Sequence, residues 1–137
     1  MHETTIDIDA TPDAVWAVLG DVTSWPSWDS GVTSVEGALA LGQKLTVAVA
    51  ANPGRAFPLK VAELDPPHRM VWTGGMPLGL FRGERTYTVD DLGDGRSRFR
   101  MAERFSGPLA RIITKRIPDL QPSFDQFSAG LKARVEG

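Results

Sequence analysis

The chain has 137 residues, of which 42% are hydrophobic and 23% are charged, and this length suits one domain with a core of its own. Its 15 basic and 17 acidic residues give a formal net charge of -2, which provides no positive field that would favour nucleic acid. Cysteine is absent, and this excludes disulfides, thiolate metal sites and a cysteine nucleophile.

Targeting signals are also absent from the sequence pattern. The first residues lack the basic and then apolar segment of a signal peptide, and no apolar run approaches the roughly 18 residues that span a bilayer. We therefore expect a soluble cytoplasmic protein without an integral membrane segment, folded as one domain over residues 1–137. The sequence leaves its oligomeric state open.

The first predicted elements are a strand and a short helix. Residues 4–9 alternate between an apolar face and an acidic face, which predicts a half-buried strand. Thr11 is a suitable N-cap, Pro12 suits the first helical position, and Gly20 ends the helix. Its inner face carries Val15, Trp16, Val18 and Leu19.

Two tryptophans, Trp25 and Trp28, follow in a turn-rich segment. Two indoles this close could form the wall of a pocket or fill the end of a core. Packing is the commoner role of large aromatic side chains.

The middle of the chain has the alternation of β-structure. The predicted strands lie near 32–37, 43–51, 57–65, 69–74, 81–91 and 96–105. The predicted turns lie at 52–54, 65–68, 74–75 and 93–95. Because these connections are too short for a parallel crossover, we expect antiparallel pairing.

Apolar residues recur at helical spacing from Leu109 to Val135. Pro118 would remove a hydrogen bond inside one continuous helix, and it restricts the preceding Ile117. We therefore expect a short helix near 108–116 and a break at Ile117–Pro118.

A second, longer helix is predicted from about 120 to 135. Asp119 suits its N-cap, and Pro122 is tolerated as its third residue. Residues 107–118 are a candidate lid.

The order strand, short helices, six strands and long helix predicts an α+β fold of the helix-grip type. A meander of that length with one apolar face curls, and the long helix can cover its concave side. We expect a curved antiparallel sheet of about seven strands wrapped on the C-terminal helix, with short helices after the first strand.

The chain resembles the START-like superfamily that includes polyketide cyclase/dehydrase-like proteins, often labelled SRPBCC. The segments that carry the resemblance are 10–16, 19–21, 25–28, 61–64, 66–72, 87–89, 95–99 and 103–109. Their shared order and spacing is more specific for the fold than for an activity, because related folds carry many functions.

The resemblance implies a deep, mostly apolar cavity between the sheet and the terminal helix. Side chains on the expected inner faces and near one mouth are the candidate ligand contacts: Trp28, Met70, Trp72, Met76, Phe81, Tyr87, Phe99, Met101, Leu120, Phe124 and Phe127. The alternative, that these side chains fill the space and leave no cavity, stays open at this stage.

Arg85, Tyr87 and Glu103 are the polar candidates for catalysis. Arg85 has the same strand parity as Tyr87, and Glu103 the same parity as Phe99 and Met101. A hairpin at 93–95 in the right register would bring Arg85 and Glu103 together inside the cavity, whereas a slip of one residue would separate them. In the alternative, either is a solvated or edge charge.

Other constellations are weak. His2 is expected at a frayed terminus and His68 in a turn, so neither a catalytic triad nor a zinc site is predicted. Asp90, Asp91 and Asp94 are better explained as turn residues than as calcium ligands. We expect no metal and no cofactor.

Three functions remain possible from the sequence. The first is binding of a hydrophobic or aromatic small molecule, as in transport or sequestration. The second is a cyclase/dehydrase-type enzyme that uses an acid or base in the same cavity. The third is a protein-interaction module of the cochaperone kind. Whether the protein is an enzyme is left open.

Overall fold

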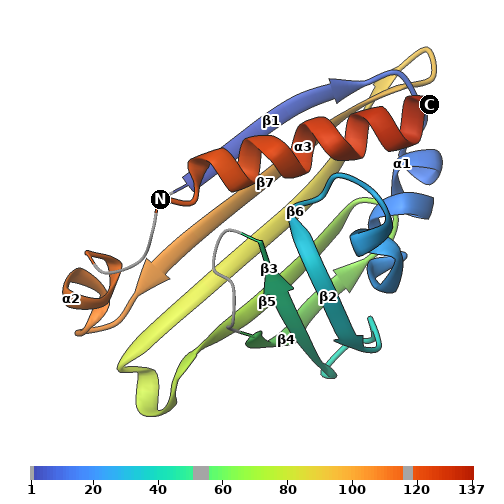
Figure 1. Cartoon of the computed structure of the whole chain (residues 1–137). Coiled ribbons are helices and arrows are strands. Elements are labelled where there is room, and N and C mark those ends of the chain that lie inside the picture. Colours follow the sequence, from blue (N-terminus) through green and yellow to red (C-terminus); the bar gives the residue numbers. More distant parts are fainter. Residues whose placement is uncertain (1, 51–55, 116–118) are drawn as a thin grey trace.

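A computed structural model describes residues 2–50, 56–115 and 119–137 (Figure 1). Its elements in chain order are β1 (His2–Ile8), α1 (Pro12–Leu19), η1 (Val22–Ser27), β2 (Val32–Gly37), β3 (Lys44–Val49), β4 (Ala56–Asp65), β5 (Arg69–Met76), η2 (Pro77–Gly79), β6 (Phe81–Gly93), β7 (Arg96–Ser106), α2 (Ala110–Thr114) and α3 (Gln121–Glu136), where η denotes a short 3₁₀ helix. None of the helices in these ranges is long and apolar enough to cross a membrane.

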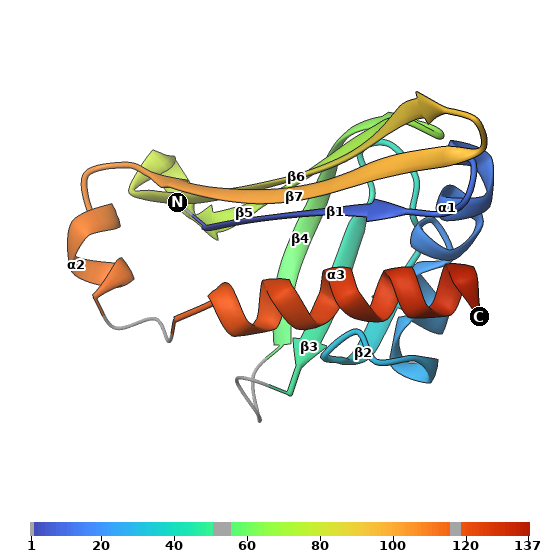
Figure 2. The same cartoon turned by 90° about the horizontal axis from the view of Figure 1, so that it is seen from above.

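Seven strands form one antiparallel sheet in the order β1-β7-β6-β5-β4-β3-β2. Consecutive strands are neighbours from β2 to β7, and β1 joins the free edge of β7. Figure 2 shows the sheet curling, so that β3 and β4 cross the direction of β6 and β7 while α3 lies along the concave side. The predicted helix-grip fold is confirmed.

The start of α1 follows from local side-chain chemistry. The Thr11 hydroxyl accepts a hydrogen bond from the Ala14 N–H at 3.3 Å, and Pro12 is the first helical residue. Val15 and Leu19 are fully buried, and Gly20 is the C-cap. The predicted short helix is confirmed at both ends.

The C-terminal stripe divides into two helices, as predicted. Helix α2 covers 110–114 and is shorter than the expected 108–116. The expected break at Ile117–Pro118 lies outside the described residues, as does the turn expected at 52–54.

The prediction of Asp119 as the N-cap of α3 is wrong. Leu120 occupies that position, so Pro122 is the second helical residue and not the third. The Asp119 carboxylate accepts a hydrogen bond from the Gln121 N–H at 3.1 Å and so satisfies a free donor of the first turn from outside the helix. Leu120 can then pack against the core.

One strand is longer than its alternation suggested. β5 continues through Gly74 and Gly75 to Met76, which pairs with Phe81 across the β5–β6 hairpin. The turn predicted at 74–75 is therefore wrong, and Met76, which was predicted to lie between that turn and the next strand, belongs to the sheet. Glycine lowers strand propensity, but pairing with β6 outweighs it here.

An aromatic cluster joins the helix to the sheet. The Trp25 ring stacks on Trp72 at a centroid distance of 5.3 Å and meets the Phe127 ring edge-on at 4.8 Å. Its indole N–H donates to the Leu19 carbonyl at 3.1 Å. Trp25 is therefore a core residue, which was the commoner of its two predicted roles.

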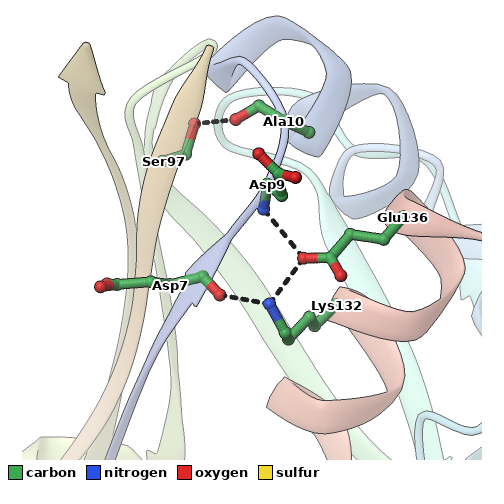
Figure 3. Close-up of polar contacts among 6 residues, drawn as sticks. All are labelled: Asp7, Asp9, Ala10, Ser97, Lys132 and Glu136. Carbon is green, nitrogen blue, oxygen red and sulfur yellow. Dashed lines mark hydrogen bonds and ion pairs between the residues drawn. The ribbon is translucent and has the colours of Figure 1, made fainter. Parts of the chain in front are cut away.

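Polar contacts hold the C-terminal end of α3 against β1 (Figure 3). The Lys132 ammonium donates to the Asp7 carbonyl at 2.8 Å and to the Glu136 carboxylate at 2.6 Å. The same carboxylate accepts the Asp9 N–H at 2.8 Å. These bonds satisfy backbone groups where β1 leaves the sheet, and they fix the end of the helix over it.

Gly130 sets how closely α3 approaches the segment after η1. A Cβ at this position would overlap the Asp29 carbonyl oxygen and lie 3.3 Å from the Trp28 ring. A helical glycine is normally unfavourable, so this one is explained by the close approach.

We predict that Gly130→Ala destabilises the protein by about 3 kcal/mol, because overpacking against fixed backbone outweighs the better helix propensity of alanine. Urea denaturation measures the change. The matched control is Ala129→Gly at the exposed neighbouring position, which should cost only about 1 kcal/mol. A Gly130→Ala protein as stable as the wild type would contradict the close approach.

Candidate functional site

A cavity of about 520 Å³ lies between the concave face of the sheet and the N-terminal half of α3. Strands β3 to β7 supply most of its lining, Ile113 comes from α2, and Leu120, Ser123, Phe124 and Phe127 come from α3 with its N-cap. Its volume lies within the usual range of small-molecule pockets, roughly 300–1,000 Å³. The expectation that the core is not completely filled is confirmed.

Two facing glycines leave room for this cavity. Gly74 pairs with Gly83 across β5 and β6, on the face that also carries Trp72 and Arg85. A Cβ at Gly74 would lie 2.8 Å from a Leu59 methyl and 3.1 Å from the Pro58 carbonyl oxygen, so a side chain there would require Leu59 to move. A Cβ at Gly83 would meet nothing closer than 3.4 Å. Part of the cavity wall is therefore bare backbone.

The aromatic cluster of Trp25, Trp72 and Phe127 borders the cavity. Trp72 and Phe127 belong both to that cluster and to the cavity lining. Met101 and Phe124 extend the apolar lining away from the cluster. An apolar body bound here would contact aromatic rings on the sheet side and on the helix side.

An ion pair between Arg85 and Glu103 faces the cavity. The register of β6 and β7 places the two residues directly opposite one another. The Arg85 Nε donates to Glu103 Oε2 at 2.8 Å, and Nη2 donates to the same oxygen. The side chains are 25% and 13% exposed, so the pair is largely desolvated. Of the two possibilities that the sequence left open, a paired arrangement and separate solvated charges, the structure has the paired one.

Arg85 is held in its charged form. Burial alone would lower the pKa of the guanidinium, but the Glu103 carboxylate and the Tyr87 phenol together raise it above its usual value. The guanidinium also lies 4.9 Å from the centre of the Phe124 ring, which gives it a cation–π contact with the helix.

Tyr87 lies next to this pair but is not part of the cavity wall. Its side chain is fully buried, and its hydroxyl has no hydrogen-bond partner among the described residues. Burial raises the pKa of Tyr87 to about 12, although the Arg85 charge opposes the shift. The phenol therefore stays neutral at physiological pH.

The predicted ligand contacts divide into two groups. Seven of the eleven line the cavity: Trp72, Met76, Phe81, Met101, Leu120, Phe124 and Phe127. Four do not: Trp28, Met70, Tyr87 and Phe99, which pack in or against the core. Of the catalytic candidates, Arg85 and Glu103 face the cavity. As contacts or catalysts, all of these residues stay predictions.

Several lining residues were missed by the sequence analysis. Phe57, Leu59, Gly83, Phe105 and Ser123 all line the cavity. Strand parity could have found Phe105, which is two residues from Glu103, and Gly83, which is two residues from Arg85. Ser123 could have been found from its place beside Phe124 at the start of α3.

Among the residues that the structure describes, neither histidine belongs to a group of three or more potential metal ligands. The expectation that His2 lies at a frayed terminus is wrong. His2 begins β1 and pairs with Glu103 in register, and its imidazole lies 3.3 Å from Asp119. The His68 ring is within 3.2 Å of the Val89 carbonyl. The Asp91 carboxylate accepts the Gly93 N–H at 2.8 Å, as a turn residue does.

Helix α2 lies beyond the N-terminal end of α3, at the opposite end of the sheet from α1 (Figures 1 and 2). Ile113 faces the cavity, whereas Ile112 is 57% exposed. A lid function for 107–118 stays a prediction.

A second hollow, of about 870 Å³, includes Lys60, Ala62 and Arg82 and is wide open to solvent, so it offers less enclosure for an apolar molecule.

The sequence and the fold are both similar to those of known proteins. A family model described as polyketide cyclase / dehydrase and lipid transport matches residues 2–136. No curated protein matches the sequence.

Three solved structures are similar in fold. The Zhui aromatase/cyclase from a Streptomyces species is 17% identical, with a TM-score of 0.72 over 98% of this chain and 92% of that one. A START superfamily protein from Mycobacterium smegmatis is 15% identical, with a TM-score of 0.70 over 98% and 95%. The di-domain ARO/CYC protein BexL, from the BE-7585A biosynthetic pathway, is 20% identical, with a TM-score of 0.71 over 98% of this chain. This chain spans only 45% of BexL.

We predict that Tyr87 titrates far above its ordinary value of 10.0, at about 12. Tyr87 is the only tyrosine, so tyrosinate absorbance reports on it alone. Because its folded-state pKa is raised, the neutral phenol stabilises the fold below pH 10.0, and this contribution is lost as the pH rises through about 12.

The control for this titration is the protein unfolded in denaturant, which should titrate near 10.0. A folded protein with the same midpoint would show that the phenol is not buried as described.

Proposed function

The chain belongs to the polyketide cyclase/dehydrase and lipid transport family, and on that basis we propose that its cavity binds a hydrophobic or aromatic small molecule, for transport or sequestration. The observation that carries the proposal is a cavity of about 520 Å³ with a mostly apolar lining and a single ion pair. Such a lining with few polar groups is typical of small-molecule sites.

The driving force for binding is the burial of apolar surface. A ligand that buries about 200 Å² of apolar area gains about 5 kcal/mol, before the cost of its lost motion is subtracted. Trp72, Phe124 and Phe127 supply rigid rings for that contact, and their side chains are already ordered by packing. Little additional side-chain entropy is therefore lost on binding.

A cyclase-type reaction is the second candidate, because Glu103 is a carboxylate that faces the cavity. Two observations favour binding over this reaction. Glu103 Oε2 already accepts two hydrogen bonds from Arg85, so this oxygen is engaged within the protein. The Tyr87 hydroxyl, the other acid or base considered, does not line the cavity. An open cavity likewise gives less support to a pure protein-interaction module.

We expect the neutral fluorescent probe N-phenylnaphthylamine to bind at one site per chain. Ser123→Leu should weaken this binding by about tenfold or more, because the added side chain occupies cavity volume. Fluorescence titration measures both affinities. Ala129→Leu is the matched control, since it places the same side chain at an exposed position of α3 and should leave the affinity unchanged. Equal weakening by both substitutions would locate the probe elsewhere.

Native mass spectrometry of protein purified from its own host should show a retained small molecule. Ser123→Leu protein prepared in the same way should retain less of it, and Ala129→Leu protein the same amount. If no molecule is retained and the fluorescent probe does not bind, the proposed function is wrong.

A further inference from the structure

The Arg85–Glu103 pair leaves hydrogen-bonding capacity of both kinds toward the cavity. Both bonds between the residues involve the same carboxylate oxygen, Oε2. Glu103 Oε1 and Arg85 Nη1 make no hydrogen bond to another side chain in the described ranges. One acceptor oxygen and one donor nitrogen of the pair therefore remain without a side-chain partner in these ranges.

Space for a ligand group exists next to the free oxygen. A Cβ built on Gly83 would lie 3.5 Å from Glu103 Oε1, and no side chain occupies that position. Gly83, Arg85 and Glu103 all line the same cavity, and Ser123 lines it from the helix side. A small polar group could therefore approach Oε1 along the bare backbone of β6.

The charge of the lining is balanced. Arg85 and Glu103 are the only charged residues among the described ones that line the cavity, so the described part of the lining has a formal net charge of zero. His2 pairs with Glu103 in the β1–β7 register, but it does not line the cavity, and its imidazole lies 3.3 Å from the Asp119 carboxylate.

This balance disfavours ionic ligands. A carboxylate beside Arg85 would also stand beside Glu103, where the two anions repel each other in a desolvated space. An ammonium group beside Glu103 would meet Arg85 with the same result. A neutral group that both donates and accepts can form a charge-assisted hydrogen bond with either residue without placing a like charge beside the other.

From these contacts we infer that the cavity selects an apolar ligand with a neutral head group, a hydroxyl or a primary amide, that donates to Glu103 and accepts from Arg85. The inference rests on the proposed function. It adds a rule for the head group, which is that neutral groups bind and carboxylates and ammonium groups are rejected.

A matched series of naphthalene derivatives tests this rule. The members are methylnaphthalene without a polar head, naphthylmethanol, naphthamide, naphthoate and naphthylmethylammonium. Isothermal titration calorimetry should rank the alcohol and the amide above the carboxylate and the ammonium by about tenfold or more. A carboxylate that binds as tightly as the alcohol would overturn the inference.

Two variants sharpen the test. Glu103→Gln keeps the shape but leaves Arg85 unopposed, so naphthoate should bind about tenfold tighter than to the wild type and should rank above the alcohol. The double variant Arg85→Gln/Glu103→Gln removes both charges, and the alcohol should lose its advantage over methylnaphthalene. If Glu103→Gln protein does not fold, the wild-type ranking alone decides.

The two proposals fail in different ways. Failure of every member of the series to bind, including methylnaphthalene, would overturn the proposed function and the inference with it. Binding of methylnaphthalene with no preference among head groups would overturn only the inference.

Discussion

The packing of Trp25 between Trp72 and Phe127 is the contact on which the rest of the structure depends. It joins η1, β5 and α3 at one place, and so it fixes the distance between the helix and the concave face of the sheet. Large rings fill the space at that end of α3. The same contact holds the curled sheet and α3 apart near the N-terminus of α3. There Gly74 and Gly83 supply no side chains, so the space between sheet and helix is not filled. The cavity is therefore a result of rigid packing next to it, and it does not require a loose core.

The ion pair can exist in this lining because strand pairing places its members opposite each other. Arg85 and Glu103 face one another in the β6–β7 register, and the guanidinium also contacts the Phe124 ring. Two charges in a largely apolar space are costly unless they are paired. Their mutual bonds reduce this cost and still leave one donor and one acceptor unused. The same pair therefore contributes to the fold and gives the cavity its only ionic character among the described residues.

Much of this fold can be predicted from sequence, because the signals are local. Thr11 and Pro12 mark a helix start, and alternation marks the strands. The pairing of Arg85 with Glu103 could not be predicted from the turn at 93–95 alone, because an irregularity between Asp91 and Gly93 shifts the β6–β7 register by one residue. That Leu120 is the N-cap of α3 could not be predicted from local signals. Asp119 has the better capping side chain, but Leu120 packs against the core. Cavity lining is harder still. Tyr87 and Met101 are directly opposite each other, yet only Met101 reaches the cavity, because depth depends on sheet curvature and on neighbouring side chains.

The facing glycines also bear on how proteins of this fold can diverge. At Gly74 a Cβ would press on the Leu59 methyl at 2.8 Å, so a side chain there requires Leu59 to move. At Gly83 the backbone has an ordinary conformation and a Cβ meets only van der Waals contacts, so a single substitution there is sterically allowed. Such a substitution would shorten the cavity beside Glu103 while leaving the sheet register intact. Descendants of one sequence could thus acquire different ligand sizes in single steps, without a change of fold or of the ion pair.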